Sequence, residues 1–247
     1  MSNDLISKTS KRLPIVLCLD VSPSMSLNNR IENLNKAIEL FYDELCKDPR
    51  VLSSAEVAII TFSTDILDDT DFETIDYIDG ISFKAVEHGV TNLSKAVLES
   101  IKKIEDRVDE LDYFDIDHYI PFLILVTDGD PDKTDNQENL EKAIESVLKH
   151  CDTNIIPEYL IAPYIIGVGN QIDKSTLDRF AENFTGEAII IDCDLSDQQF
   201  FFDELFTFIS NSVKNSLKGA ENLKSLFESI KKQAKNQSPN FFYKRLK

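Results

Sequence analysis

Short apolar stretches alternate with longer helical patterns along most of this 247-residue chain, and this alternation limits its fold more than any other feature. The first stretch, residues 15–20, carries Val, Ile and Leu on both faces, as a strand inside a parallel sheet requires. Residues 30–47 then place apolar side chains three and four positions apart, which predicts an amphipathic helix. Repetition of this strand-helix-strand order predicts an α/β domain with a mostly parallel sheet.

The same patterns predict the remaining elements. No helix fits between the apolar stretches at 56–63 and 72–78, so 72–78 is expected to be an antiparallel edge strand. The Asp48-Pro49 pair ends the first helix, because proline disfavours a helical residue before it. We therefore expect a doubly wound, Rossmann-like, six-stranded sheet with one antiparallel edge strand and helices on both faces. The predicted strands are 15–20, 56–63, 72–78, 121–127, 162–168 and 188–192, and the predicted helices are 30–47, 91–108, 136–150, 175–183, 197–217 and 221–235.

Charge changes sign late in the chain. Residues 211–247 hold nine Lys and Arg against two Glu, which gives them a net charge of +7. Because the whole chain has a net charge of −18, residues 1–210 have a net charge of −25. We divide the chain accordingly into an N-terminal tail (1–12), one domain (13–218) and a basic C-terminal helix and tail (219–247). The acidic body repels phosphate backbones, so we expect no nucleic acid to bind there. The basic segment either binds an anionic partner or is a solvated helix that offsets the acidic body.

The sequence also bears on location and redox state. No stretch approaches the roughly 20 apolar residues that cross a bilayer, so we expect no membrane span. Residues 1–12 lack the apolar core of a signal peptide, which favours a cytoplasmic protein. The four cysteines lie far apart, without the paired spacing of zinc or redox sites, and are expected to be reduced and mostly buried.

Three oxygen-bearing side chains follow the first predicted strand at alternate positions: Asp20, Ser22 and Ser24. Alternate residues of an extended loop point the same way, so these three side chains can converge on one point. Carboxylate and hydroxyl oxygens are hard donors suited to Mg²⁺, which takes octahedral oxygens at roughly 2.1 Å. Because no soft ligand is nearby, the pattern does not favour zinc or copper.

Two further segments bring oxygens to the same edge, because ligands of open α/β sheets sit at the carboxyl ends of the strands. Thr91 opens a predicted helix and offers a third hydroxyl. Asp128 follows a predicted central strand and offers a second carboxylate, which would bind directly or through water. The candidate metal ligands are therefore Asp20, Ser22, Ser24, Thr91 and Asp128.

These motifs carry a resemblance. Asp-x-Ser-x-Ser after the first strand, Thr opening a later helix and Thr-Asp-Gly after a central strand resemble the metal-ion-dependent adhesion site of the von Willebrand factor A domain. The resemblance implies that the hydroxyls of Ser22, Ser24 and Thr91 coordinate the metal. It also implies that Asp20 and Asp128 bind the metal directly or through water, and that one coordination position stays open for a carboxylate of a partner protein.

The resemblance further implies adhesion or assembly rather than catalysis, with Mg²⁺, or else Mn²⁺ or Ca²⁺, as the cofactor. The chain is most similar to the small cytoplasmic bacterial type associated with tellurite resistance, whose members often accompany protein kinases and phosphatases. The expected partner presents an Asp or Glu carboxylate, and a kinase or phosphatase of the same stress-response or signalling system is one candidate. Pro23 stands where glycine is common in the family, which stiffens the loop but keeps the ligand spacing.

Two rival functions stay open at this point. Phosphatases of the haloacid-dehalogenase type also place a nucleophilic Asp after the first strand and an acidic Mg²⁺ loop later. They need a second carboxylate two residues on as the general acid, and Ser22 stands there instead. The other rival is a metal-free regulatory scaffold that binds its partner through the basic C-terminal helix.

Local alternatives exist for single residues as well. The serines of the first loop could cap nearby backbone amides of an ordinary turn. Thr91 could be the N-cap of its helix. Asp130, Asp132 and Asp135 could hold a second cation such as Ca²⁺, although a solvated acidic loop is common in so acidic a chain.

Overall fold

One mostly parallel sheet forms the centre of the molecule in the computed structural model. The structure describes residues 11–77, 81–129, 135–154, 160–169, 172–191, 198–217, 225 and 227–232. Within this part of the chain seven strands join in the order β3-β2-β1-β5-β6-β7, and β4 pairs with β2. The strands are β1 (Leu13–Asp20), β2 (Ala55–Phe62), β3 (Ile66–Asp69), β4 (Glu73–Thr74), β5 (Phe122–Thr127), β6 (Ala162–Val168) and β7 (Ile189–Ile191).

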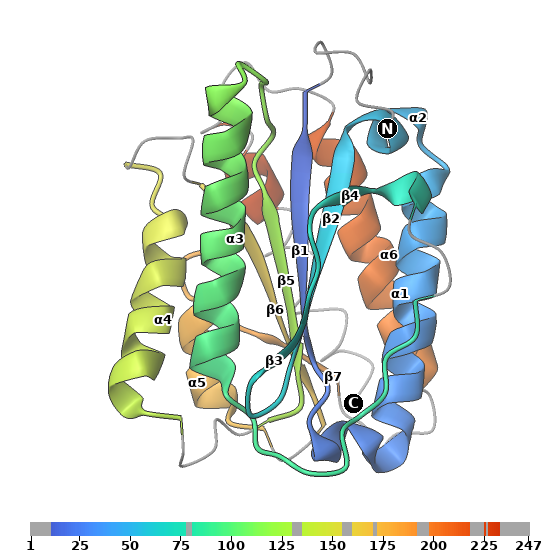
Figure 1. Ribbon diagram of the computed structural model, residues 1–247, viewed down its shortest axis with the longest axis vertical. Helices are drawn as coiled ribbons and strands as arrows, with labels where there is room; N and C mark the ends of the chain where they lie inside the picture. The colour runs from blue at the N-terminus through green and yellow to red at the C-terminus, as the bar shows by residue number, and fades with distance from the viewer. Residues whose placement is uncertain are drawn as a thin grey trace.

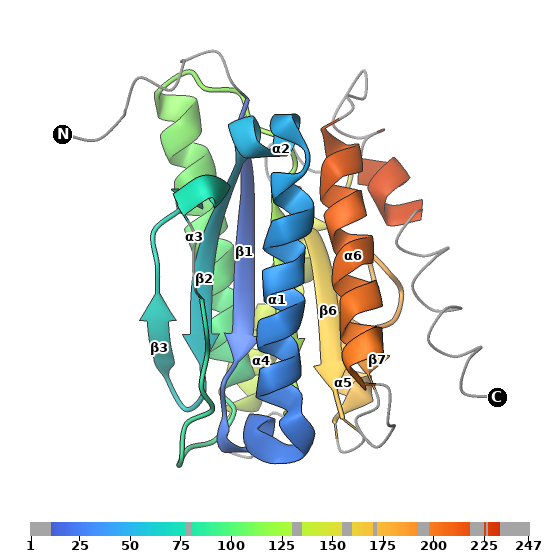
Figure 2. The same ribbon diagram turned by 90° about the vertical axis from the view of Figure 1, so that its right-hand side faces the viewer.

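Helices cover both faces of this sheet. Figures 1 and 2 show α1 and α6 packed together on one face, with α3 and α4 on the other. This arrangement confirms the predicted doubly wound α/β fold class. The described ranges contain α1 (Arg30–Cys46), α2 (Pro49–Ser54), α3 (Leu93–Tyr113), α4 (Gln137–His150), α5 (Lys174–Ala181) and α6 (Gln198–Ser216), together with the 3-10 helices η1 (Pro23–Asn29) and η2 (Ile75–Tyr77).

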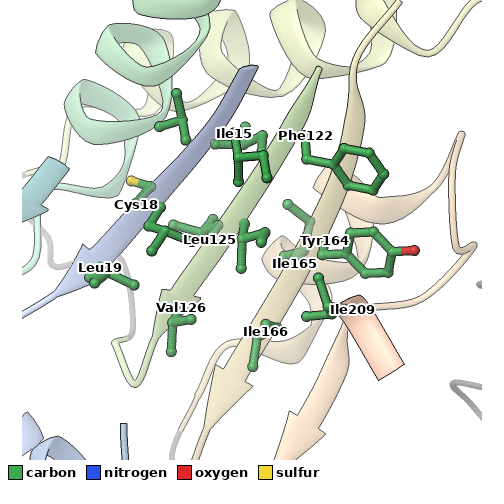
Figure 3. Close-up of a cluster of buried hydrophobic side chains, with 14 of the residues drawn as sticks. Ile15, Cys18, Leu19, Phe122, Leu125, Val126, Tyr164, Ile165, Ile166 and Ile209 are labelled. Carbon is green, nitrogen blue, oxygen red and sulfur yellow. The ribbon is translucent and has the colours of Figure 1, made fainter. Parts of the chain in front are cut away.

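The central strand β1 explains why the first apolar stretch is continuous. It pairs in parallel with β2 on one side and β5 on the other, and all eight of its residues are buried. Side chains from both faces of such a strand enter a core, so alternation with polar residues is lost. Figure 3 shows part of this core, where the rings of Phe122 and Tyr164 on neighbouring strands stack with centroids 6.1 Å apart.

The antiparallel edge differs from the sequence prediction. Two short strands, β3 and β4, pair antiparallel with β2, so the predicted count of six strands is wrong by one. Of the predicted strand 72–78, the described residues 72–77 form a strand at Glu73–Thr74 and then the 3-10 helix η2, which buries Ile75; residue 78 lies outside the described residues. β3 was not predicted because half of its residues are aspartates, which have a low propensity for strands. Its hydrogen-bonded pairing with β2 stabilises the strand in spite of this low propensity.

The first helix ends where the Asp48-Pro49 pair predicts, since α1 stops at Cys46. A second short helix, α2, was not predicted and begins at once. Asp48 is its N-cap and accepts a hydrogen bond from the backbone N of Arg50 at 3.0 Å, and Pro49 occupies the first turn. The pair therefore ends one helix and starts the next, because proline fits the first helical position as well as it interrupts a helix interior.

Part of the basic C-terminal segment packs on the domain. Residues 227–232 are helical, and the side chains of Phe227 and Ile230 are buried. The ring of Phe227 lies 5.7 Å from that of Phe184, measured between centroids. The boundary between 218 and 219 stays a prediction, and most of the segment lies outside the described residues.

Two smaller expectations can also be compared with the structure. None of the helices in the described ranges combines the length and the apolar character that a bilayer crossing needs. Cys18 and Cys151 are free and buried, as expected, whereas Cys46 is free and exposed. Cys193 lies outside the described residues.

The central position of β5 makes its side chains a sensitive test of this architecture. We expect Leu125→Ala, which truncates a fully buried side chain, to lower the free energy of unfolding by about 2–5 kcal/mol. Leu67→Ala on the exposed edge strand β3 should lower it by less than about 1 kcal/mol, because Leu67 is 48% exposed. Urea titration measures both. Equal losses in the two variants would contradict a core centred on β5.

Candidate metal centre

The candidate centre lies where β1 and β5 end side by side. Asp20 is the last residue of β1, and Asp128 directly follows β5. The parallel register sets Leu19 opposite Val126, so Asp20 lies beside Thr127. The Thr127 hydroxyl donates to Oδ2 of Asp20 at 2.6 Å, a contact that was not predicted from the sequence. The two candidate carboxylates therefore share one edge of the sheet, as the order of the motifs predicts.

The loop after β1 folds back as a tight turn. The backbone N of Ser22 donates to Oδ1 of Asp20 at 2.8 Å, and the chain then enters the 3-10 helix η1. Ser22 Oγ and Ser24 Oγ are 3.0 Å apart, and Ser24 Oγ donates to Oδ1 of Asp128 at 2.7 Å. The side chains thus converge as expected, but through a turn and a 3-10 helix rather than an extended loop. Ser22 makes no side-chain cap of η1, so the capping alternative is wrong for it.

Thr91 reaches the same region from the segment before α3. It is buried, and it packs so closely on Gly129 that a methyl group at 129 would lie 2.7 Å from both Oγ1 and Cγ2 of Thr91. Only glycine accepts this approach without a shift of the neighbouring chain. The helix cap is Asn92, which accepts from the backbone N of Lys95 at 3.3 Å. Thr91 is therefore not the N-cap, and its side chain lies against the loop that carries Asp128.

Asp135, a candidate ligand of a second cation, forms hydrogen bonds with Ser94. Its carboxylate accepts from the backbone N of Ser94 at 3.0 Å and also from the Ser94 hydroxyl, in the first turn of α3. Asp130 and Asp132 lie outside the described residues. Gly129 and Asp135 therefore both lie against the start of α3.

The electrostatics of the centre are unfavourable for two ionised carboxylates. Asp20 is 0% exposed and Asp128 is 5% exposed. Burial, and then the nearby charge of Asp128, raise the pKa of Asp20 to about 6, although hydrogen bonds from Thr127 and Ser22 act in the opposite direction. Buried negative charge of this kind favours a bound cation, which would relieve both effects.

Arg30 is a member of the centre that the sequence reading placed only as the first residue of a helix. Its Nη1 donates to Oδ2 of Asp128 at 2.7 Å, and both side chains are almost completely buried. A signal was present in the sequence, because a basic residue at a helix N-terminus opposes the helix macrodipole. Such a placement indicates that another interaction holds the guanidinium there.

These residues fit a small, hard cation. Neighbouring oxygens around an octahedral Mg²⁺ lie about 3 Å apart, because each is about 2.1 Å from the ion. The two serine oxygens are 3.0 Å apart. Among the described residues no three His, Cys, Asp or Glu side chains form a metal cluster, and the oxygens gathered here are mainly hydroxyls. Ser24 is the most exposed of the five candidates, so the centre opens on its side. Which oxygens bind a cation directly stays a prediction.

Several solved structures share this fold. The PilB minor pilin from Streptococcus sanguinis aligns with a TM-score of 0.54 and 13% identity, over 85% of this chain and 64% of the pilin. The human COPII-coat protein Sec24c aligns with a TM-score of 0.51 and 10% identity, over 82% of this chain and 32% of Sec24c. Proximal thread matrix protein 1 from the mussel byssus aligns with a TM-score of 0.50 and 15% identity, over 81% of this chain and 46% of the matrix protein. The chain spans less than two thirds of each of these structures, and identities this low show the fold alone.

The sequence itself decides the family. No curated protein sequence matches this chain. The sequence model of the von Willebrand factor type A domain, in contrast, matches residues 15–208, which include both carboxylates, both serines and Thr91. Because this match covers most of the chain, the protein belongs to the von Willebrand factor type A domain family.

Proposed function

We propose that this protein is a non-catalytic binding module that takes up a divalent cation of the Mg²⁺ type and captures a carboxylate of a partner protein. One observation gives this proposal its main support. Two buried carboxylates, Asp20 and Asp128, lie at the ends of adjacent strands with two serine hydroxyls linked between them. A divalent cation offsets the repulsion of these carboxylates, and the hydroxyls supply further oxygens without adding charge.

Each residue of the centre has a distinct task in this proposal. Asp20 and Asp128 supply the negative charge that attracts the cation, and Ser22, Ser24 and Thr91 supply neutral oxygens. The cation, when bound, would act as a Lewis acid with one position left for a partner's carboxylate oxygen. Thr127 and the backbone N of Ser22 hold the Asp20 carboxylate in a single orientation, so little ordering is needed when the cation binds.

The loop that carries Ser22 and Ser24 continues to an exposed leucine, which we propose as a contact for the partner. Leu27 lies three residues after Ser24 in η1, and its side chain is 56% exposed. The next two residues, Asn28 and Asn29, have φ values of 51° and 56°, which asparagine tolerates better than most residues. An exposed leucine three residues after a candidate ligand fits a partner that presents an apolar side chain near its carboxylate.

The rival functions fit these residues less well. A phosphatase of this type needs a second carboxylate two residues after its nucleophile as the general acid, and the residue there is Ser22, whose hydroxyl cannot protonate a leaving group at neutral pH. A metal-free scaffold gives no reason to bury two carboxylates together. The resemblance drawn from the sequence adds a cytoplasmic, stress-response or signalling setting to the proposal, with a kinase or phosphatase as a candidate partner.

The first test is cation-dependent stability of the full chain. We expect Mg²⁺ or Mn²⁺ at a hundred times its Kd to raise the free energy of unfolding by about 2.7 kcal/mol, because the ion binds the folded state. Asp20→Asn should abolish this gain, while Asp109→Asn on the exposed side of α3 should keep it. Melting curves with and without chelator measure the effect. A wild-type curve that no divalent cation shifts would contradict the proposal.

The second test uses the pKa of Asp20. Its folded-state pKa of about 6 exceeds the ordinary value of 3.8, so ionisation of Asp20 destabilises the cation-free fold above pH 6 and has no such effect below pH 4. In chelator at pH 7.5 we therefore expect Asp20→Asn to raise the free energy of unfolding by up to about 3 kcal/mol. The gain should shrink as the pH falls from 6 to 4. A pH-independent difference in urea titrations would refute this assignment.

The third test concerns the partner. Affinity capture with Mg²⁺ present should recover a protein that is lost with chelator and lost with Asp128→Ala. Leu27→Ser should lower capture roughly tenfold, as removal of an apolar anchor of about 1–2 kcal/mol does. Leu67→Ser on β3 removes another exposed leucine, 48% exposed against 56% for Leu27, and should leave capture unchanged. Hydrolysis of p-nitrophenyl phosphate above background would instead favour the phosphatase.

A further inference from the structure

Arg30 is the one fixed positive charge that directly contacts a candidate ligand among the described residues of the centre. It opens α1, where the helix macrodipole disfavours a cation, and its side chain is only 8% exposed. Burial of a guanidinium is costly unless its partners compensate. Its Nε is buried without a hydrogen-bond partner, so the side chain is held by its other nitrogen atoms. The contacts of Nη1 show which residue the guanidinium binds.

The guanidinium is directed at Asp128. Nη1 donates to Oδ2 of Asp128 at 2.7 Å, and it lies 3.5 Å from the backbone O of Ser24. The Ser24 hydroxyl donates to the other oxygen, Oδ1, at 2.7 Å. The carboxylate of Asp128 is therefore held between one charged donor and one neutral donor, and its side chain is fully buried.

The fold makes room for this arrangement at Gly169, just after β6. A methyl group at 169 would lie 2.7 Å from Nη2 of Arg30, and the backbone there has a φ of +112°. The positive φ favours glycine at this position, and a side chain there would displace the guanidinium of Arg30. Three separate segments, the start of α1 and the chain after β5 and after β6, therefore contribute to the placement of one positive charge.

This charge changes what the centre can bind. The two buried carboxylates contribute −2, and Arg30 brings the total to −1. A divalent cation then leaves a net charge of +1, whereas a centre without Arg30 would become neutral. Moreover, an oxygen that accepts from Arg30 is less available to a cation, so Asp128 offers mainly one oxygen.

We propose that Arg30 is a positioning residue that weakens cation binding and keeps the cation-bound centre positively charged, so that it selects an anionic group. The inference rests on the proposed function. It makes two claims of opposite sign: loss of the Arg30 charge strengthens cation binding and weakens carboxylate binding. A purely structural role would weaken both together.

The test compares Arg30→Gln with the wild-type full chain. Calorimetry with Mn²⁺ should show roughly tenfold tighter binding in Arg30→Gln, because a repelling charge is removed. Line broadening of ¹³C-acetate by bound Mn²⁺ reports occupation of the open position, and acetate should bind roughly fivefold more weakly in the variant. Arg30→Lys retains the charge and should stay within about threefold of the wild type in both measurements.

Each outcome distinguishes this inference from the proposed function. If the wild type binds no Mn²⁺, the proposed function fails whatever Arg30 does. If the wild type binds Mn²⁺ and Arg30→Gln binds both Mn²⁺ and acetate more weakly, only the role of Arg30 is overturned. Circular dichroism checks the fold of the variant. Should Arg30→Gln not fold, tenfold tighter Mn²⁺ binding or loss of acetate binding in Arg30→Lys would overturn the inference.

Discussion

The burial of two carboxylates at the ends of adjacent parallel strands is the constraint on which the centre depends. Asp20 and Asp128 lie together because β1 and β5 are neighbours and run the same way. Their mutual repulsion and loss of hydration would destabilise the fold if nothing opposed them. Thr127, the backbone N of Ser22 and the guanidinium of Arg30 offset part of that cost. The remainder explains why the pKa of Asp20 is raised to about 6.

Much of this arrangement could be predicted from the sequence, because it follows from periodicity and chain order. The continuous apolar stretch ending at Asp20 predicts a central strand, and the ends of parallel strands must meet at one edge. That reasoning is sufficient to bring Asp20, Ser22 and Asp128 into one region without coordinates. The sequence also predicts that Ser24 lies near Asp128, but it predicts an extended loop between Asp20 and Ser24. In the structure, Ser24 lies in the 3-10 helix η1 and donates a hydrogen bond to Asp128 from there.

What could not be predicted depends on contacts between distant parts of the chain. β3 has a sequence too acidic to read as a strand, and it forms because β2 offers an unpaired edge. The role of Arg30 is another case, since it requires Asp128 at 98 positions along the chain and a glycine after β6 that leaves space for the guanidinium. No local pattern around Arg30 encodes either partner. Its unusual place at a helix N-terminus was the single local sign.

The overall charge of the protein and the local charge of the centre act over different distances. Residues 1–210 carry −25, a field that repels anionic surfaces until screening by salt weakens it beyond about 8 Å at physiological ionic strength. In the proposed cation-bound state the centre itself carries +1, owing to Arg30. A partner surface that is acidic throughout would therefore be repelled before contact, whereas a single carboxylate on a neutral or basic surface could approach and bind. The acidic body thus restricts the class of partner, and the centre fixes where its carboxylate is held.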